Sequence, residues 1–184
     1  MATPVHMRKA DGRILLGVAL FILFCGCSRN RAETPYGDAA SLVAYRVAVD
    51  PLINEINEVE QSLRAMAVGS TGRATGENLA VACQLLDGRL TTVLSQIDAI
   101  DPPRKLRAMH ADMRTAVDLR LRACKRIVVG WQIEREASFE VAQSTYLEAE
   151  ALLSEARARL VAVNAVLSEV DVALDSVGFQ SPMA

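Results

Sequence analysis

Residues 139–174 read FEVAQSTYLEAEALLSEARARLVAVNAVLSEVDVAL, and this stretch decides the fold. Its apolar side chains alternate at spacings of three and four residues; they are Phe139, Ala142, Tyr146, Ala149, Leu153, Ala156, Leu160, Val163, Leu167, Val170 and Leu174. This spacing places one apolar stripe on one face of a helix, where partner helices bury it. The stretch predicts a helix that begins between Glu134 and Ser138 and ends near Val177, with a length of about 60 Å. Gly178 is expected to stop it.

Three earlier segments carry the same stripe, and they cover residues 38–67, 75–100 and 103–129. Their stripe positions are Leu42, Tyr45, Val49, Leu52, Ile56, Val59, Leu63 and Met66, then Leu79, Cys83, Leu86, Leu90, Val93, Ile97 and Ile100, then Leu106, Met109, Met113, Val117, Leu121, Cys124 and Val128. Pro51 lies within the first segment. Because the stripe keeps its phase across this proline, the pattern favours one kinked helix over two separate helices.

Short connections separate the four predicted helices. Residues 69–72 have the composition of a turn, residues 101–103 end the second helix with two prolines, and Gly130 is expected to end the third. Helices joined by so few residues pack antiparallel. The sequence therefore predicts an all-α fold: an antiparallel up-down-up-down four-helix bundle with coiled-coil-like heptads, over residues 38–178. Residues 179–184 are expected to form a frayed tail.

Composition and charge narrow the class of protein. The chain has 184 residues, of which 51% are apolar and 4% aromatic, and this suits one domain of closely packed helices. Of the 20 basic and 22 acidic residues, residues 1–26 hold three and one, so the remainder carries a net charge of −4. This balance argues against nucleic acid as a partner. The third helix is basic and the last is acidic, and we expect these charges to pair within the bundle rather than with anionic lipid or an acidic partner.

Two of the four cysteines lie on the predicted buried stripes. Cys83 lies 20 residues before Pro103 and Cys124 lies 21 residues after it, so an antiparallel hairpin brings the two nearly level. A disulfide requires Cα atoms within about 4.4–6.8 Å, so a small axial slip prevents it. The sequence leaves open a structural disulfide and a pair of buried free thiols, and an oxidising compartment slightly favours the disulfide.

The N-terminal segment has the organisation of an export signal. Three basic residues precede Ile14–Phe24, which is eleven residues without a charge. A charged start followed by an apolar core of this length is typical of a secretory signal, whereas a spanning helix needs about 20 apolar residues. Translation from Met1 and translation from Met7 both leave the basic region in place.

The end of this segment resembles the lipobox of bacterial lipoprotein precursors. Gly26 precedes Cys27 as in that family, whereas Phe24 and Cys25 depart from its usual residues. The resemblance implies that the signal peptide, residues 1–26, is cleaved between Gly26 and Cys27. It also implies that Cys27 carries a diacylglyceryl thioether and usually an amide-linked acyl chain, which together hold the protein in membrane lipid.

The same resemblance predicts a location. Ser28 follows the acylated cysteine in place of Asp, which implies an outer-membrane address, on the periplasmic face, if the organism is a diderm. Residues 27–37 would then be the lipidated cysteine and a flexible tether, because polar residues, proline and glycine dominate them. The alternatives are ordinary cleaved secretion and an uncleaved N-terminal anchor. In every case the mature chain is extracytoplasmic.

Motifs for catalysis, cofactors and metals are missing from the sequence. His110 is the only histidine after residue 26, and we expect it on a helix flank rather than in a metal site. There is no phosphate-binding loop, dinucleotide fingerprint or haem attachment motif, and the Glu-x-x-His pair of di-iron bundles is missing. The sequence therefore predicts no catalytic residues, no cofactor and no metal.

One end of the predicted bundle carries a candidate contact surface. Arg126, Trp131 and Arg135 lie near the end remote from the tether, and Trp and Arg are common interface anchors. The alternative is that Trp131 closes the end of the bundle by packing. We expect a membrane-anchored, non-catalytic bundle for protein contact or envelope structure, with an envelope protein as its partner. The alternative is an extracytoplasmic ligand-binding or sensory bundle with a pocket between its helices.

Overall fold

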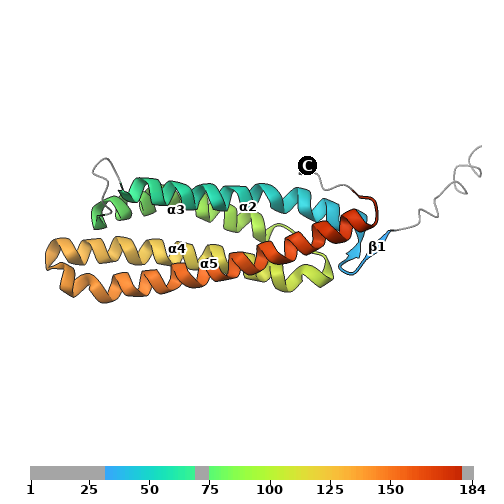
Figure 1. Cartoon of the computed structure of the whole chain (residues 1–184). Coiled ribbons are helices and arrows are strands. Elements are labelled where there is room, and N and C mark those ends of the chain that lie inside the picture. Colours follow the sequence, from blue (N-terminus) through green and yellow to red (C-terminus); the bar gives the residue numbers. More distant parts are fainter. Residues whose placement is uncertain (1–31, 69–74, 180–184) are drawn as a thin grey trace, which may run out of the picture. The chain divides into compact units, whose positions relative to one another are not determined.

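Four long helices make up most of the structure, a computed structural model that describes residues 32–68 and 75–179 (Figure 1). The helices are α2 (Ala39–Val68), α3 (Gly76–Asp98), α4 (Arg107–Glu136) and α5 (Phe139–Ser176), and a single 3₁₀ turn, η1 (Arg104–Leu106), precedes α4. Successive helices run in opposite directions (Figure 1). The predicted all-α antiparallel four-helix bundle is therefore confirmed.

A short β-hairpin precedes the first helix. β1 (Glu33–Thr34) pairs antiparallel with β2 (Gly37–Asp38), and Gly37 takes the positive φ of 128° that the turn requires. The Tyr36 hydroxyl donates a hydrogen bond to Glu169 on α5, and Lys105 Nζ donates to the Pro35 carbonyl at 2.5 Å. The prediction of a flexible tether is therefore wrong for residues 32–37, because these contacts attach the hairpin to the bundle.

Several helix ends follow from local sequence. Thr75 caps α3, with its hydroxyl oxygen accepting from the Asn78 backbone N–H at 3.1 Å. At the end of α5, Gly178 takes a φ of 77°, and the Phe179 N–H donates to the Leu174 carbonyl at 3.1 Å. α2 continues through Pro51 as one helix, as the phase of its stripe predicted.

The predicted helix end at Gly130 is wrong. α4 continues to Glu136, and Gly130 is buried within it. A Cβ atom at this position would lie 2.8 Å from Cε1 of Tyr146 on α5, which is closer than such atoms approach in proteins. Gly130 therefore allows two helices to approach closely, and only Ala137 and Ser138 connect α4 to α5.

The apolar stripes form the core, but not evenly along the bundle. Most predicted stripe residues are buried, whereas Phe139 has 52% of its surface exposed. The stripe residues that are only partly buried gather toward the end that holds the 68–75 and 136–139 connections, and they include Leu63, Met66, Leu79, Val128, Tyr146 and Leu153. The core is therefore less complete at this end.

The helix pairs differ in how closely they pack. α4 and α5 share the most extensive contact, followed by α3 with α4 and α2 with α3, whereas α2 and α5 touch little. α5 lies near the start of α2 at one end and diverges from α2 toward the other end (Figure 1). None of the helices in the described ranges combines the length and apolarity that crossing a membrane requires.

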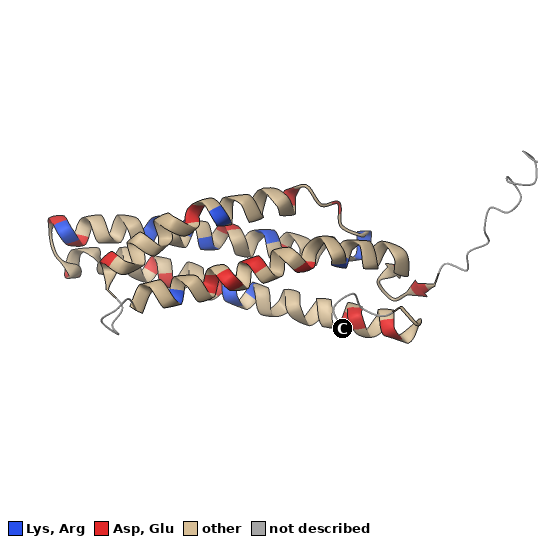
Figure 2. Cartoon of the chain, turned by 90° about the horizontal axis from the view of Figure 1, so that it is seen from above, with Lys and Arg blue, Asp and Glu red and all other residues tan. Residues whose placement is uncertain are grey.

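Three basic residues of α4 pair with acids on the three other helices, and Figure 2 shows basic and acidic positions distributed along the bundle. Arg114 contacts Asp98 on α3 at 2.6 Å, Arg126 contacts Glu148 on α5 at 3.2 Å, and Arg120 contacts Glu60 on α2. The expected pairing with acidic α5 is thus found only in part. In one further α4–α5 pair, the acid is Asp112 on α4 and the base is Arg159 on α5.

A candidate binding cleft between α2 and α5

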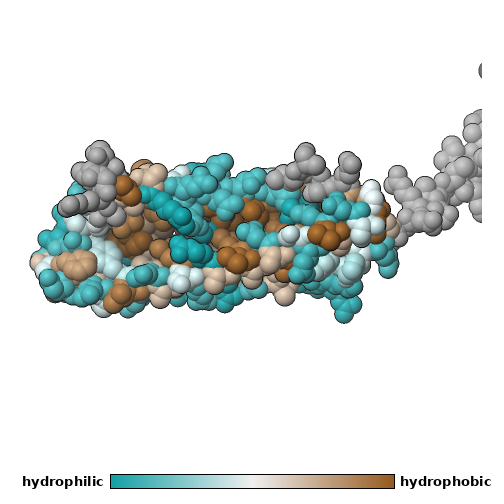
Figure 3. All heavy atoms as spheres, viewed as in Figure 1, coloured by the Kyte–Doolittle hydropathy of each residue, from teal (hydrophilic) through white to brown (hydrophobic). Residues whose placement is uncertain are grey.

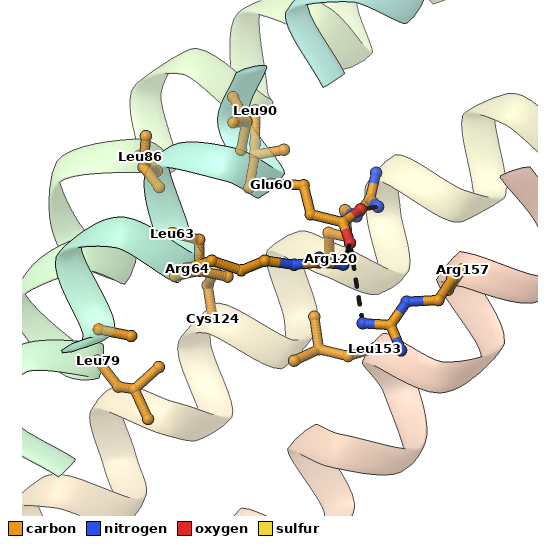
Figure 4. Close-up of a pocket in the computed structure, with 12 residues that line it drawn as sticks. Glu60, Leu63, Arg64, Leu79, Leu86, Leu90, Arg120, Cys124, Leu153 and Arg157 are labelled. Carbon is orange, nitrogen blue, oxygen red and sulfur yellow. Dashed lines mark hydrogen bonds and ion pairs between the residues drawn. The ribbon is translucent and has the colours of Figure 1, made fainter. Parts of the chain in front are cut away.

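A cavity of about 190 Å³ lies where α2 and α5 diverge. All four helices contribute to its lining, and its apolar residues are Val59, Leu63, Ala67, Leu79, Leu86, Leu90 and Leu153 (Figure 4). Seen from outside, this side of the bundle is hollowed, with a hydrophobic floor crossed by hydrophilic side chains (Figure 3). We call this cavity with its charged residues the α2–α5 cleft.

The cleft exists because α5 changes character along its length. The buried residues of α5 at this end are all alanines, at positions 142, 149 and 156, whereas farther along they are mainly Leu160, Val163, Leu167, Val170 and Leu174. Short side chains fill less of the interior between helices. Because α5 also packs closely on α4 at Gly130, the space next to α2 stays unfilled.

Glu60 of α2 is the only acid in the cleft, and three arginines surround it. Arg64, one turn along α2, and Arg120 of α4 both pair with it, and Arg157 of α5 lies 3.8 Å from its Oε1. Glu60 and Arg157 reach toward each other across the cavity (Figure 4). With three guanidinium groups and one carboxylate, the cluster carries a net charge of +2.

Arg120 is the most constrained member of this cluster. Only 6% of its surface is exposed, and its Nη1 has no hydrogen-bond partner among the residues that the structure describes, whereas its Nη2 donates to Glu60. Burial lowers the pKa of Arg120, and the neighbouring Arg157 and Arg64 lower it further while Glu60 opposes them. Arginine nevertheless stays charged, so this buried cation keeps an unused donor, and its side chain lines the apolar cavity.

The arrangement is suited to binding rather than to chemistry. An apolar floor takes up an apolar group, and guanidinium donors recognise an anion. Among the described residues that line the cavity there is no histidine, serine or threonine, and their one thiol is in contact with another. Within residues 32–68 and 75–179, no three His, Cys, Asp or Glu side chains gather in the way that a metal site requires.

Cys83 and Cys124 face each other between α3 and α4. Both are buried and present as free thiols, close enough for a hydrogen bond between the two sulfurs. That contact, followed by burial, raises the pKa of the Cys83 thiol. Cys124 also lines the cleft. The predicted proximity is therefore present, and a disulfide in oxidised protein stays a prediction.

The three residues proposed as a contact surface lie on the last turns of α4 rather than in a connection. Arg126 is exposed and pairs with Glu148, and Arg135 is also exposed. Trp131 is partly buried and packs against the core, which favours the alternative that it closes the end of the bundle. A Cβ atom on Gly76 would lie 3.0 Å from its ring, so α3 begins directly against it.

The three remaining predicted residues have different outcomes. Gly26 and Cys27 lie outside the described residues. His110 is buried rather than on a helix flank, and that expectation is wrong. Its Nδ1 accepts from the Tyr45 hydroxyl at 2.9 Å and its Nε2 donates to the Ile97 carbonyl at 3.2 Å, an arrangement that fits a neutral ring. Burial accordingly lowers the pKa of His110.

The sequence contained a signal for Arg120 that its polar character hid. Arg120 follows Val117 by three residues and precedes Cys124 by four, which is the spacing of the buried stripe itself. Glu60 follows Ile56 by four residues and precedes Leu63 by three, which is also the spacing of a buried stripe. A charged residue at a stripe position is a candidate for a buried charge, and two such positions on different helices predict a pair.

Comparison of the chain with family models, with curated proteins and with solved structures finds no significant match.

Proposed function

We propose that this protein is a membrane-anchored extracytoplasmic lipoprotein whose helical bundle binds a small ligand in the α2–α5 cleft without catalysis. The observation that carries the proposal is Arg120, a buried cation whose side chain lines an apolar cavity and whose Nη1 has no partner among the described residues. Buried donors without partners are rare in folded proteins, because each costs about 1–3 kcal/mol. Nη1 is covered by other atoms, so a ligand that accepts from it requires the guanidinium group to turn toward the cavity, and this contact would remove the cost.

The anchor in this proposal is Cys27, acylated as in the lipoprotein precursors that the N-terminus resembles. Four residues lie between Cys27 and Ala32, and the five Cα–Cα steps span at most about 18 Å. Ala32 adjoins the hairpin, and its carbonyl accepts from the Ala39 N–H at 2.9 Å. We call this end of the bundle, where α2 begins and α5 ends, the closed end, and the end that holds the cleft the open end. The cleft would then open toward the end farther from the lipid anchor.

The anchor is tested by Cys27→Ser, with Cys25→Ser as the matched control. We expect Cys27→Ser to lose labelling by radioactive palmitate and to leave the lipidated membrane fraction, because its hydroxyl cannot form the thioether. Cys25→Ser should be processed as the wild type is. Equal labelling of both variants would contradict the anchor and would leave the cleft unaffected.

The cleft is tested with a neutral photoreactive probe, octanol carrying a diazirine, on the full chain in nanodiscs of phosphatidylcholine. We expect labelled peptides from the cleft-lining parts of α2 and α5. Ala67→Phe fills the cavity without altering a charge and should abolish this labelling. Labelling confined to other surfaces, or unchanged in Ala67→Phe, would contradict a ligand-binding role.

Protein contact at the envelope is the second candidate. Large apolar side chains are exposed on α5 at Phe139, Val141, Leu147, Val161 and Val172. Phe139 and Val141 lie together at the start of the helix, whereas the other three are separated by more than ten positions, and single exposed apolar residues are normal on monomers. This role therefore ranks below ligand binding, and a negative result with the photoreactive probe would reverse the order.

A further inference from the structure

We propose that the α2–α5 cleft selects a single-chain amphipathic carboxylate, with its short alkyl or phenyl tail in the cavity and its carboxylate on Arg120. This inference rests on the proposed ligand-binding function and adds the chemical class of the ligand. It does not depend on the lipid anchor.

Charge decides the sign of the ligand. Within the cluster, both oxygens of Glu60 are already engaged: Oε1 with Arg64 and Arg157, and Oε2 with Arg120. The net charge of +2 therefore has no counterpart among the described residues that line the cavity. A cationic ligand would add to the repulsion, and a neutral alcohol would leave the charge uncompensated.

The shape of the cluster favours one planar carboxylate. A guanidinium group donates in the plane of its fork, which matches the two oxygens of a carboxylate. Arg120 is fixed by burial, whereas the side chains of Arg64 and Arg157 are 66% and 61% exposed. These two side chains can turn toward a carboxylate seated on Arg120 without leaving a buried position.

The cavity limits the tail. Its volume of about 190 Å³ is comparable to that of engineered apolar cavities that bind benzene. A phenyl group or a short alkyl chain fits this space, and the apolar residues of α2, α3 and α5 surround it. The two arms of the test, an alkyl and an aryl carboxylate, distinguish free fatty acids from aromatic acids as the source.

The experiment uses the full chain in phosphatidylcholine nanodiscs and octanoic acid carrying a diazirine. Labelling of cleft peptides is followed in competition with octanoate, 4-phenylbutyrate, octanol, octylamine and octyl phosphate. We expect octanoate or 4-phenylbutyrate to compete at least about tenfold better than octanol, because charge-assisted hydrogen bonds add 1.4 kcal/mol or more. Octylamine should compete least.

Arg120→Gln tests the contact directly. We expect at least about tenfold weaker binding of the acid and a smaller effect on labelling by the neutral octanol probe, since the cavity remains but its lining changes. Arg114→Gln, which removes an exposed pair on the same helix outside the cleft, is the matched control and should bind as wild type. If Arg120→Gln fails to fold, Arg157→Gln at the surface provides the test, with about threefold weaker binding of the acid expected.

The outcomes separate the two proposals. If the octanol probe labels the cleft but octanoate competes no better than octanol, the cleft binds ligands and the carboxylate inference is wrong. Stronger competition by octylamine or octyl phosphate would also overturn the inference. If neither photoreactive probe labels the cleft, the proposed function itself fails.

Discussion

The two ends of the α2–α5 interface both contain buried charges, but they use them in opposite ways. At the closed end, one cation lies between two anions: Arg46 Nη2 is 3.2 Å from Asp50 and 3.1 Å from Asp171. At the open end, one anion, Glu60, lies among three cations. The closed-end cluster carries a charge of −1 and joins α2 to α5, whereas the open-end cluster carries +2 and joins them only through a 3.8 Å contact.

The atoms without partners sharpen this contrast. At the closed end they are of both kinds, a donor on Arg46 and acceptors on Asp50 and Asp171, so bridging water can satisfy them together. At the open end the one such atom among the described residues is a donor, Nη1 of Arg120, whose side chain lines an apolar cavity. The closed end is therefore built to hold two helices together, and the open end has spare capacity for an anion.

The largest expected effect is at the closed end. Arg46→Met should lower the free energy of unfolding by about 3 kcal/mol, because it leaves Asp50 and Asp171 without their shared cation. Burial raises the pKa of Asp50, with Asp171 adding to this and Arg46 opposing it. A carboxyl group with a raised folded pKa gains relative stability as the pH falls, so the loss in Arg46→Met should shrink from pH 7 to pH 5.

Urea unfolding at several pH values measures this effect. Arg114→Met, which removes an exposed arginine with one carboxylate partner, is the control and should cost under about 1 kcal/mol. A loss in Arg46→Met as small as that of the control would mean that the closed end does not depend on its charges. The contrast between the two ends would then disappear.

The second effect concerns the two cysteines between α3 and α4, of which Cys124 lines the cleft. Under oxidation by oxygen or oxidised glutathione, the two thiols of Cys83 and Cys124 should lose two electrons and two protons to the oxidant and form a disulfide. A loop of this length adds up to roughly 4 kcal/mol in the chain-entropy model, and about 3 kcal/mol is expected here because native geometry rarely allows the full value.

Thiol titration in denaturant and urea unfolding measure the bridge, with Cys83→Ala as the control that cannot form it. Because α3 and α4 already pack together, binding of the neutral octanol probe should not change on oxidation. Oxidation that leaves both thiols titratable would establish the free-thiol alternative. A loss of probe binding would show instead that the position of Cys124, which lines the cleft, determines the shape of the cavity.

Most of the fold was accessible from the sequence because the heptad stripes report burial directly. The stripes of α2 and α3 predicted their buried residues and their ends to within about two residues, which is the usual uncertainty of helix ends. The errors occurred where tertiary contact overrides local rules. By local rules Gly130 predicts a helix end. It lies within α4 instead, because the ring of Tyr146 on α5 packs against it and leaves no room for a Cβ atom.

The cleft was less accessible, because it depends on how far apart two helices lie. A stripe shows which face of a helix is buried and not which partner covers it. The alanines at positions 149 and 156 are stripe residues like any other, and only the structure shows that they leave space next to α2. The arginines that select the ligand come from three helices, so no local motif joins them.

A smaller effect is expected from the anion at the open end. Glu60→Gln should lower the free energy of unfolding by about 2 kcal/mol, because Arg120 loses the one acid that pairs with it among the described residues. The loss is smaller than in Arg46→Met because the side chain of Glu60 is partly exposed. The same change removes the competitor for the arginines, so binding of octanoate should become about tenfold tighter.

Urea unfolding with and without octanoate tests both parts, and Glu55→Gln, whose carboxylate pairs with Arg89 outside the cleft, is the control. Saturating octanoate should restore much of the lost stability in Glu60→Gln and little in the control. Weaker binding of octanoate to Glu60→Gln would indicate that Glu60 orients the arginines rather than competing for them. The open end would then resemble the closed end in holding itself together.

The smallest effect is a pH dependence from His110, which lies next to the closed end through its hydrogen bond with Tyr45. Burial lowers its pKa in the folded protein, and the negative charges of Asp98 and Asp101 and the hydrogen bond to Ile97 oppose this shift only in part. The unfolded chain therefore binds a proton near pH 6.5 that the folded protein resists, so stability should fall as the pH decreases below this value. Between pH 7 and pH 5.5 we expect a loss of about 1 kcal/mol in the free energy of unfolding, and His110→Gln should remove this pH dependence.

Asp50 acts in the opposite direction over the same pH range, so the effect of the histidine is isolated by the difference in slope between the wild type and His110→Gln. Identical slopes would show that the ring is neutral or charged alike in both states, and would place the pH response of the closed end on its carboxylates alone.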